Sequence, residues 1–133
     1  MRKRALLFMV VIAVLLFAIS FGVSADIVDE GTCGDNLTWT LDDEGTLTIE
    51  GTGAMTNFSS SFSVPWYKNH DAVKTVMIGN SVTSVGDYAF YDCANLTRVS
   101  LPDSLTAVGL CAFYGCASLT NISLPAAPPR LKM

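Results

Sequence analysis

Histidine and basic residues are scarce in this 133-residue chain, and their scarcity excludes several classes of function. His70 is the single histidine, so neither a histidine-based metal cluster nor a paired-histidine mechanism is available. Eight lysine and arginine residues stand against twelve aspartate and glutamate residues. An acidic chain without a basic stripe is a poor partner for phosphate backbones, so nucleic-acid binding is excluded.

Recognisable catalytic and cofactor motifs are also missing. The sequence has no CxxC pair, nucleophile elbow, phosphate loop or dinucleotide fingerprint. The acidic run Asp42-Asp43-Glu44 could be half of a calcium site or a pair of catalytic carboxylates, but no second cluster at loop-ligand spacing accompanies it, and a turn is the simpler interpretation. His70 is interpreted as a solvated loop residue. The sequence therefore predicts no enzyme, no cofactor and no metal site.

A long apolar run occurs once, at the N-terminus. Basic residues at positions 2–4 precede an apolar run from Ala5 to about Phe21, and Val23-Ser24-Ala25 offers small residues at the cleavage positions. This pattern predicts a signal peptide over residues 1–25. An uncleaved membrane anchor is the alternative, because the run approaches the length that spans a bilayer. We therefore expect a secreted or cell-surface protein, whose exported part carries five bases against twelve acids, a net charge of −7.

The main positive feature is a segment that is written twice and begun a third time. Residues 73–95 read VKTVMIGNSVTSVGDYAFYDCAN, residues 96–118 read LTRVSLPDSLTAVGLCAFYGCAS, and Leu119 restarts with LTNISLP. Self-similarity at a fixed short period is typical of a solenoid, because so small a unit buries its apolar face only against its neighbours. Function is therefore expected on an outer surface.

Each 23-residue copy predicts one coil that begins with a strand. Apolar and variable residues alternate in Val76-Met77-Ile78, Val99-Ser100-Leu101 and Ile122-Ser123-Leu124, which indicates strands with one buried face. Stacked coil on coil, these strands should form a short parallel sheet. A turn follows each strand, because glycine or proline comes next (Gly79, Pro102 and Pro125).

The remainder of each coil predicts a bend and a second apolar wall. Gly86 and Gly109 mark a bend that needs either a positive φ or a close backbone approach. Phe90 and Phe113 occupy the same repeat position and should stack as an apolar column inside the solenoid.

Four cysteines follow the leader, and two of them share a repeat position. Equivalent side chains in stacked coils lie roughly 5 Å apart and point the same way, so Cys93 and Cys116 should both enter the core. Free buried thiols are favoured over a disulfide, because the Cβ directions suit a disulfide poorly. Cys33 and Cys111 lie outside this column.

The repeat pattern V-x-x-V-x-I/L-P-x-S-L/V-T-x-V-G-x-x-A-F-Y-x-C-x-x-L resembles the leucine-rich repeat of BspA-like bacterial surface proteins. The resemblance implies a mainly-β leucine-rich-repeat solenoid with 23-residue coils and an N-terminal β-hairpin cap. The segment before the repeats is similar to that cap: strands at 37–41 and 46–50 would be joined by a turn ending in Gly45, and Trp66 would pack over the end of the solenoid. The expected units are therefore residues 26–72 for the cap and its connection, 73–125 for the repeats and 126–133 for a tail.

The resemblance also implies a non-catalytic role in adhesion or protein binding, with a host or matrix protein as the expected partner. Side chains that face outward on the strands, and a repeated tyrosine on the opposite wall, are the candidate contacts. The tyrosines could instead simply stack to stabilise neighbouring coils. The candidate partner-binding residues are Tyr91, Tyr114, Met77, Arg98 and Ser100.

The third coil raises a question of closure, since solenoids need about three repeats and a polar cap. The proline pair at 128–129 is expected to prevent the sheet from continuing, which would leave Ile122, Leu124 and the underside of Phe113 partly exposed. We expect either self-association through this uncapped coil or a fragment of a longer surface protein that has no ligand of its own. A secreted hydrolase is the remaining alternative, and the missing motifs count against it.

Overall fold

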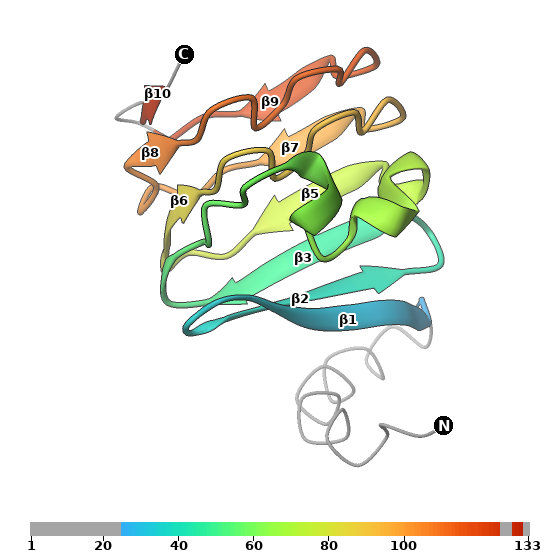
Figure 1. Cartoon of the computed structure of the whole chain (residues 1–133), viewed down its shortest axis with the longest axis horizontal. Helices are drawn as coiled ribbons and strands as arrows, with labels where there is room; N and C mark the ends of the chain where they lie inside the picture. The colour runs from blue at the N-terminus through green and yellow to red at the C-terminus, as the bar shows by residue number, and fades with distance from the viewer. Residues whose placement is uncertain (1–24, 126–128, 132–133) are drawn as a thin grey trace.

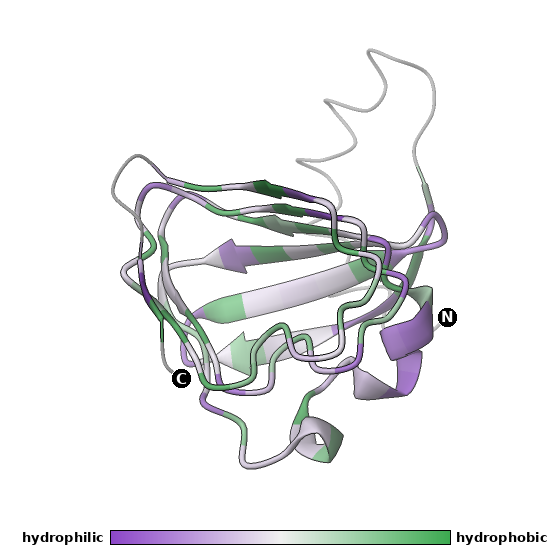
Figure 2. Cartoon of the chain, turned by 90° about the horizontal axis from the view of Figure 1, so that it is seen from above, coloured by the Kyte–Doolittle hydropathy of each residue, from purple (hydrophilic) through white to green (hydrophobic). Residues whose placement is uncertain are grey.

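Two sheets and a wall of loops surround one apolar interior, and the coils overlie one another when seen from above (Figures 1 and 2). The computed structural model describes residues 25–125 and 129–131, so the predicted signal peptide, apart from Ala25, lies outside the described residues. The described elements are, in chain order, β1 (Ile27–Gly34), β2 (Leu37–Asp42), β3 (Thr46–Gly51), β4 (Gly53–Ala54), the 3-10 helices η1 (Ser61–Ser63) and η2 (Tyr67–Ala72), β5 (Thr75–Ile78), β6 (Val82–Val85), β7 (Arg98–Ser100), β8 (Ala107–Val108), β9 (Asn121–Ser123) and β10 (Arg130–Leu131).

The first sheet confirms the predicted stack of parallel repeat strands. Its order is β1-β2-β3-β5-β7-β9, and β5, β7 and β9 pair in parallel. Val76 lies beside Val99, which lies beside Ile122, so residues at one repeat position form one row across the sheet. The sequence repeat is therefore also the spatial repeat, and the fold is a mainly-β leucine-rich-repeat solenoid.

The predicted N-terminal hairpin is present, and it covers the first coil by adding strands to its sheet. β2 and β3 are antiparallel, while β3 pairs in parallel with β5. Gly45 has a φ of 85° in the turn, a conformation that glycine adopts without a steric penalty. Asp42 Oδ1 accepts hydrogen bonds from the amides of Glu44 and Thr46, both at 2.9 Å. The acidic run therefore acts as a turn.

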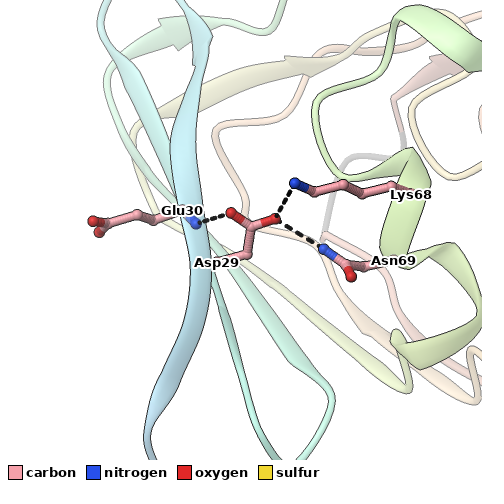
Figure 3. Close-up of polar contacts among 4 residues, drawn as sticks. All are labelled: Asp29, Glu30, Lys68 and Asn69. Atoms are coloured by element: carbon pink, nitrogen blue, oxygen red, sulfur yellow. Dashed lines mark hydrogen bonds and ion pairs between the residues drawn. The ribbon is translucent and has the colours of Figure 1, made fainter. Parts of the chain in front are cut away.

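Strand β1 was not expected from the sequence. It pairs antiparallel with β2 and forms one edge of the first sheet. Its sequence, IVDEGTCG, contains two acids and two glycines and lacks clear alternation, so its pairing comes from the neighbouring strand rather than from its own propensity. Figure 3 shows how β1 is held: Asp29 Oδ2 accepts a hydrogen bond from Asn69 Nδ2 at 2.9 Å and lies 3.6 Å from Lys68 Nζ, both in η2.

A second sheet, in the order β10-β8-β6-β4, runs along another wall of the coils. Among the described residues the sheet of repeat strands ends at β9, but the chain after the proline pair still adds a strand to this second sheet. Arg130 pairs with Ala107 in parallel, and its amide donates to the Thr106 carbonyl at 3.0 Å. Proline removes only its own N–H donor, so the residue after Pro129 can still join the ladder.

The bend between the second sheet and the loops depends on close backbone approach. Gly86 and Gly109 are not among the described glycines with positive φ. A positive φ is therefore not the reason for glycine at these positions. A Cβ on Gly86 would overlap the Thr56 carbonyl oxygen, and one on Gly109 would lie 2.5 Å from the Asp87 amide nitrogen. Each glycine therefore lets one coil rest directly on the backbone of the coil before it.

The apolar interior is well covered near the cap and poorly covered at the last coil. Val76 and Val99 are completely buried, whereas Ile122 is 40% exposed and Leu124 is 58% exposed. Phe113 is partly buried against the core. The predicted exposure of the last coil is therefore confirmed. Within the described residues, the structure contains no helix with the length and apolar character needed to cross a membrane.

Candidate protein-binding surfaces

The predicted sheet-face residues lie together on the outer face of the first sheet. Met77 of β5 pairs with Ser100 of β7, and the neighbouring row places Arg98 between Thr75 and Asn121. Met77 is 42% exposed, Arg98 is exposed and Ser100 is half-buried. This surface is an open sheet face that combines hydroxyls, one thioether and one guanidinium.

The two predicted tyrosines lie on a different surface, which we call the loop wall (residues 86–96 and 109–119). Tyr91 and Tyr114 stack with ring centroids 5.0 Å apart and an interplanar angle of 12°. Tyr88 leans toward Tyr91 at 5.8 Å. Tyr114 is 60% exposed, while Tyr91 is half-buried. Partial desolvation raises the pKa of Tyr91, and the nearby Asp92 carboxylate raises it further, so its hydroxyl keeps its proton and remains a hydrogen-bond donor.

Beneath these tyrosines runs an internal column of aromatic rings. Trp66 stacks on Phe90 at 5.5 Å, and Phe90 stacks on Phe113 at 5.3 Å, both with interplanar angles of 21°. Trp66 Nε1 donates to the Ala89 carbonyl at 2.8 Å. The expectation that Trp66 packs over the end of the solenoid is confirmed. This column holds the backbone of the loop wall in place and thereby positions the tyrosines.

The structure also corrects the interpretation of His70. Instead of a solvated loop residue, it is part of η2, with its side chain 25% exposed. Its ring stacks on Tyr67 at 4.4 Å, its Nδ1 lies 2.7 Å from the Tyr67 carbonyl oxygen, and its Nε2 lies 3.4 Å from Asp71. Stacking on the Tyr67 ring, together with the contact between Nδ1 and the Tyr67 carbonyl oxygen, is the physical reason that this side chain is shielded from solvent. Within the part of the chain that the structure describes, no three His, Cys, Asp or Glu side chains are grouped to hold a metal.

All four cysteines are free thiols in the described structure, which agrees with the prediction made for Cys93 and Cys116. Cys33 and Cys93 are buried, and burial raises the pKa of each to about 12. Burial also raises the pKa of Cys116 to about 11, and its Sγ donates to the Phe90 carbonyl at 3.2 Å. A thiol that keeps its proton is a poor nucleophile. These cysteines therefore act as small packing groups.

Sequence reasoning missed two further aromatic side chains near the loop wall. Phe62 of η1 is 80% exposed and packs edge-on against Tyr67 of η2 at 5.2 Å. A signal was available, because the pair Trp66-Tyr67 repeats the aromatic pairs Phe90-Tyr91 and Phe113-Tyr114. It was hidden because these residues precede the clear 23-residue repeats.

Comparisons with known proteins agree with this architecture. Residues 60–131 match a family model described as "BspA type Leucine rich repeat region (6 copies)". A solved leucine-rich repeat protein from Eubacterium ventriosum is similar over 71% of this chain, with 32% identity and a TM-score of 0.66. This chain covers 26% of that protein. No curated protein matches the chain. Because the family model spans more than half of the sequence, the chain belongs to the BspA-type leucine-rich repeat family.

Proposed function

We propose that this chain is a non-catalytic, exported module that binds a host or matrix protein outside the cell, in solution or at the cell surface. The observation that carries the proposal is the exposed tyrosine pair of the loop wall. Tyr91 and Tyr114 are stacked, and 60% of Tyr114 remains exposed. Rigid tyrosines bind partners at a low entropic cost and present both an apolar ring and a hydroxyl.

Membership of a leucine-rich repeat family supports a protein-interaction role for the module. The buried apolar column explains how the fold serves it. Phe90 and Phe113 fill the interior, so the adjacent tyrosines are held outward by the same coils. Stacked repeats of this kind present extended outer surfaces for binding.

The outer sheet face is the second part of the proposed binding surface. Met77, Arg98 and Ser100 lie on neighbouring strands whose backbone positions are set by the ladder. Methionine adapts to irregular partner surfaces, and arginine offers a fork of donors to carboxylates. Their partner-binding role is separate from that of the tyrosines, because the two groups occupy different walls.

Export rests on the N-terminal 25 residues and has its own test. Replacing the basic residues at positions 2–4 with glutamate should keep the full-length chain inside the producing cell, because the positive region directs insertion of the apolar run. Fractionation of cells and medium measures this. Equal recovery of both chains from the medium would contradict the proposal.

Binding is tested with the full-length chain and purified extracellular-matrix proteins immobilised one at a time. A saturable interaction is expected, and the double variant Tyr91→Ser/Tyr114→Ser should weaken it at least about tenfold, a loss of about 1.4 kcal/mol. The matched control is Val28→Ser on β1, a residue 58% exposed on the edge strand of the first sheet. Circular dichroism checks that each variant is folded. Unchanged affinity in the tyrosine variant would place the binding site elsewhere.

A further inference from the structure

The tyrosine pair of the loop wall continues into the segment before the repeats. Three aromatic pairs occur at successive levels of the solenoid: Trp66-Tyr67, Phe90-Tyr91 and Phe113-Tyr114. In each pair the first ring belongs to the internal column, in which Trp66, Phe90 and Phe113 stack in order. The second residue of each pair is a tyrosine, and Tyr91 and Tyr114 stack on each other outside the column. The repeated order is expected to place Tyr67 on the same side of the column.

Phe62 and His70 widen this row at the cap end. Phe62 packs edge-on against Tyr67, and His70 stacks on the same ring with an interplanar angle of 5°. Together these side chains form what we call the aromatic strip (Phe62, Tyr67, His70, Tyr88, Tyr91 and Tyr114). Its two ends are its most accessible points, because Phe62 is 80% exposed and Tyr114 is 60% exposed. Large exposed aromatics at both ends of one surface are typical of an interaction site.

Carboxylates lie beside the strip. Asp71 has a side chain 78% exposed and approaches His70 Nε2 to 3.4 Å. Asp92 is adjacent to Tyr91 and raises the pKa of its hydroxyl. Lys68, the basic residue of η2, is paired with Asp29 of β1 at 3.6 Å (Figure 3). The other described bases are Lys74, Arg98 and Arg130, against twelve acids after position 25.

Aromatic rings beside carboxylates favour binding of a positively charged partner. A lysine or arginine side chain gains from contact with an aromatic ring and from attraction to a carboxylate. A surface of negative sign also raises the encounter rate of a positively charged partner. An acidic segment meets repulsion at the same place.

We propose that the aromatic strip binds a lysine- or arginine-rich segment of a partner protein. This inference rests on the proposed protein-binding function and names the chemistry of the partner. Tyr67 and Tyr91 form the centre of the site, and Phe62 and Tyr114 close its two ends. Asp71 and Asp92 select the positive charge.

The test uses the full-length chain and three short synthetic peptides of equal length, in which serine alternates with arginine, glutamine or glutamate. Fluorescence anisotropy measures binding. The arginine peptide should bind at least about tenfold more tightly than the glutamine peptide, equivalent to about 1.4 kcal/mol, and the glutamate peptide should bind least. Raising the salt concentration should reduce this preference.

Two variants separate strip binding from general charge attraction. Phe62→Ala/Tyr114→Ala removes exposed rings without opening the core, and Asp71→Asn/Asp92→Asn removes charge while keeping side-chain shape. Each should weaken arginine-peptide binding about tenfold, whereas Val28→Ala on the edge strand should have no effect. Wild-type affinity in the ring variant would overturn the proposal, because the binding would then be unspecific electrostatic attraction.

Two other results with the peptides would each overturn part of the proposal. Equal binding of the arginine and glutamine peptides would overturn the charge selection while leaving protein binding in place. Failure of all three peptides would overturn the proposed partner chemistry. The proposed function fails separately, when the matrix proteins bind neither the wild-type chain nor any variant.

Discussion

At the covered coils Val76 and Val99 are completely buried, whereas Ile122, at the same repeat position in the last coil, is 40% exposed. The same contrast recurs along the strand and across the interior. Leu101 is 6% exposed and its counterpart Leu124 is 58% exposed. Phe90, Cys93 and Leu96 are buried, while their counterparts Phe113, Cys116 and Leu119 are only partly buried.

The difference between the covered coils and the last coil shows that the direction of a side chain and its burial have separate causes. Alternation within a coil decides which side chains point inward, and this holds in all three coils. Burial is supplied by the neighbouring coil, because each unit contacts little else. At the other end the cap supplies this cover, since β3 pairs with β5, Trp66 stacks on Phe90, and Asp29 ties β1 to η2. Side chains at the same repeat position should therefore contribute differently to the free energy of unfolding in different coils.

The sharpest test compares one residue type at one repeat position. Phe90→Ala should cost about 3–5 kcal/mol in unfolding free energy, because a fully buried ring leaves a cavity between Trp66 and Phe113. Phe113→Ala should cost less than half as much, since its ring has a covered face on one side. Urea denaturation measures both, and Phe90→Leu gives a milder version if the alanine variant does not fold. Equal costs would show that the last coil is covered in solution.

A second test concerns the contact between the cap segment and the first repeat. Gly86→Ala should cost about 2 kcal/mol, because its Cβ meets the Thr56 carbonyl, a backbone atom that cannot rotate away. Gly79→Ala is the matched control: its Cβ would lie 3.2 Å from the Ile49 carbonyl oxygen, which needs a smaller adjustment. Thermal unfolding of both variants measures the difference. A Gly86 variant as stable as the control would mean that this contact is loose.

The cysteine column extends the comparison to pH. An unfolded thiol ionises near its ordinary pKa of 9.0, whereas burial raises the pKa to about 12 for Cys93 and about 11 for Cys116. The free energy of unfolding is therefore unaffected by these thiols below pH 9. Above pH 9 only the unfolded thiols ionise, so the free energy of unfolding falls by about 1.4 kcal/mol per pH unit for each thiol until its folded pKa is reached. Cys93→Ala should remove more of this loss than Cys116→Ala. Urea midpoints at alkaline pH under reducing conditions measure it, and identical pH profiles would contradict the prediction.

These contrasts also show how far the sequence alone can predict the structure. The parallel strands, the Phe90–Phe113 column and the Tyr91–Tyr114 stack could be predicted because each feature is repeated, and repetition makes alternation visible in a short strand. The spacing between Thr46 and its strand partner Thr75 is longer than the 23-residue period, because η1 and η2 lie between them. The contribution of β3 to the parallel sheet was therefore hidden.

Side-chain contacts outside the repeats were harder to predict. Phe62 and Tyr67 meet only because η1 and η2 pack together, and their positions relative to Tyr91 depend on the stacking of Trp66 on Phe90. No local pattern specifies such contacts. Strand β1 is similar, since its pairing is supplied by β2 and by the contact between Asp29 and Asn69. Which surface binds a partner stays a prediction for every candidate residue.

The exposed end of the solenoid provides a fourth test. Among the described residues, β9 pairs on one side only in the first sheet, and Ile122 and Leu124 are exposed there. A sheet edge with apolar neighbours is prone to self-pairing. We expect self-association that rises with protein concentration, and Leu124→Lys should weaken it about tenfold, or about 1.4 kcal/mol. Val28→Lys is the control, because Val28 is equally exposed, at 58%, on the opposite edge strand. Sedimentation measures this, and a monomer at every concentration would contradict it.

The smallest expected change in stability concerns two equivalent residues with the same unusual backbone conformation. Tyr88 and Cys111 occupy one repeat position, and both have positive φ, 62° and 54°. Asparagine tolerates this left-handed conformation better than most other residues, so Cys111→Asn should gain about 0.5 kcal/mol. Tyr88→Asn relieves the same strain but removes a ring packed against the core, so it should be destabilising. Urea denaturation of both variants compares the signs. If Cys111→Asn destabilises the chain as Tyr88→Asn does, the Cys111 side chain contributes more through packing than its conformation costs.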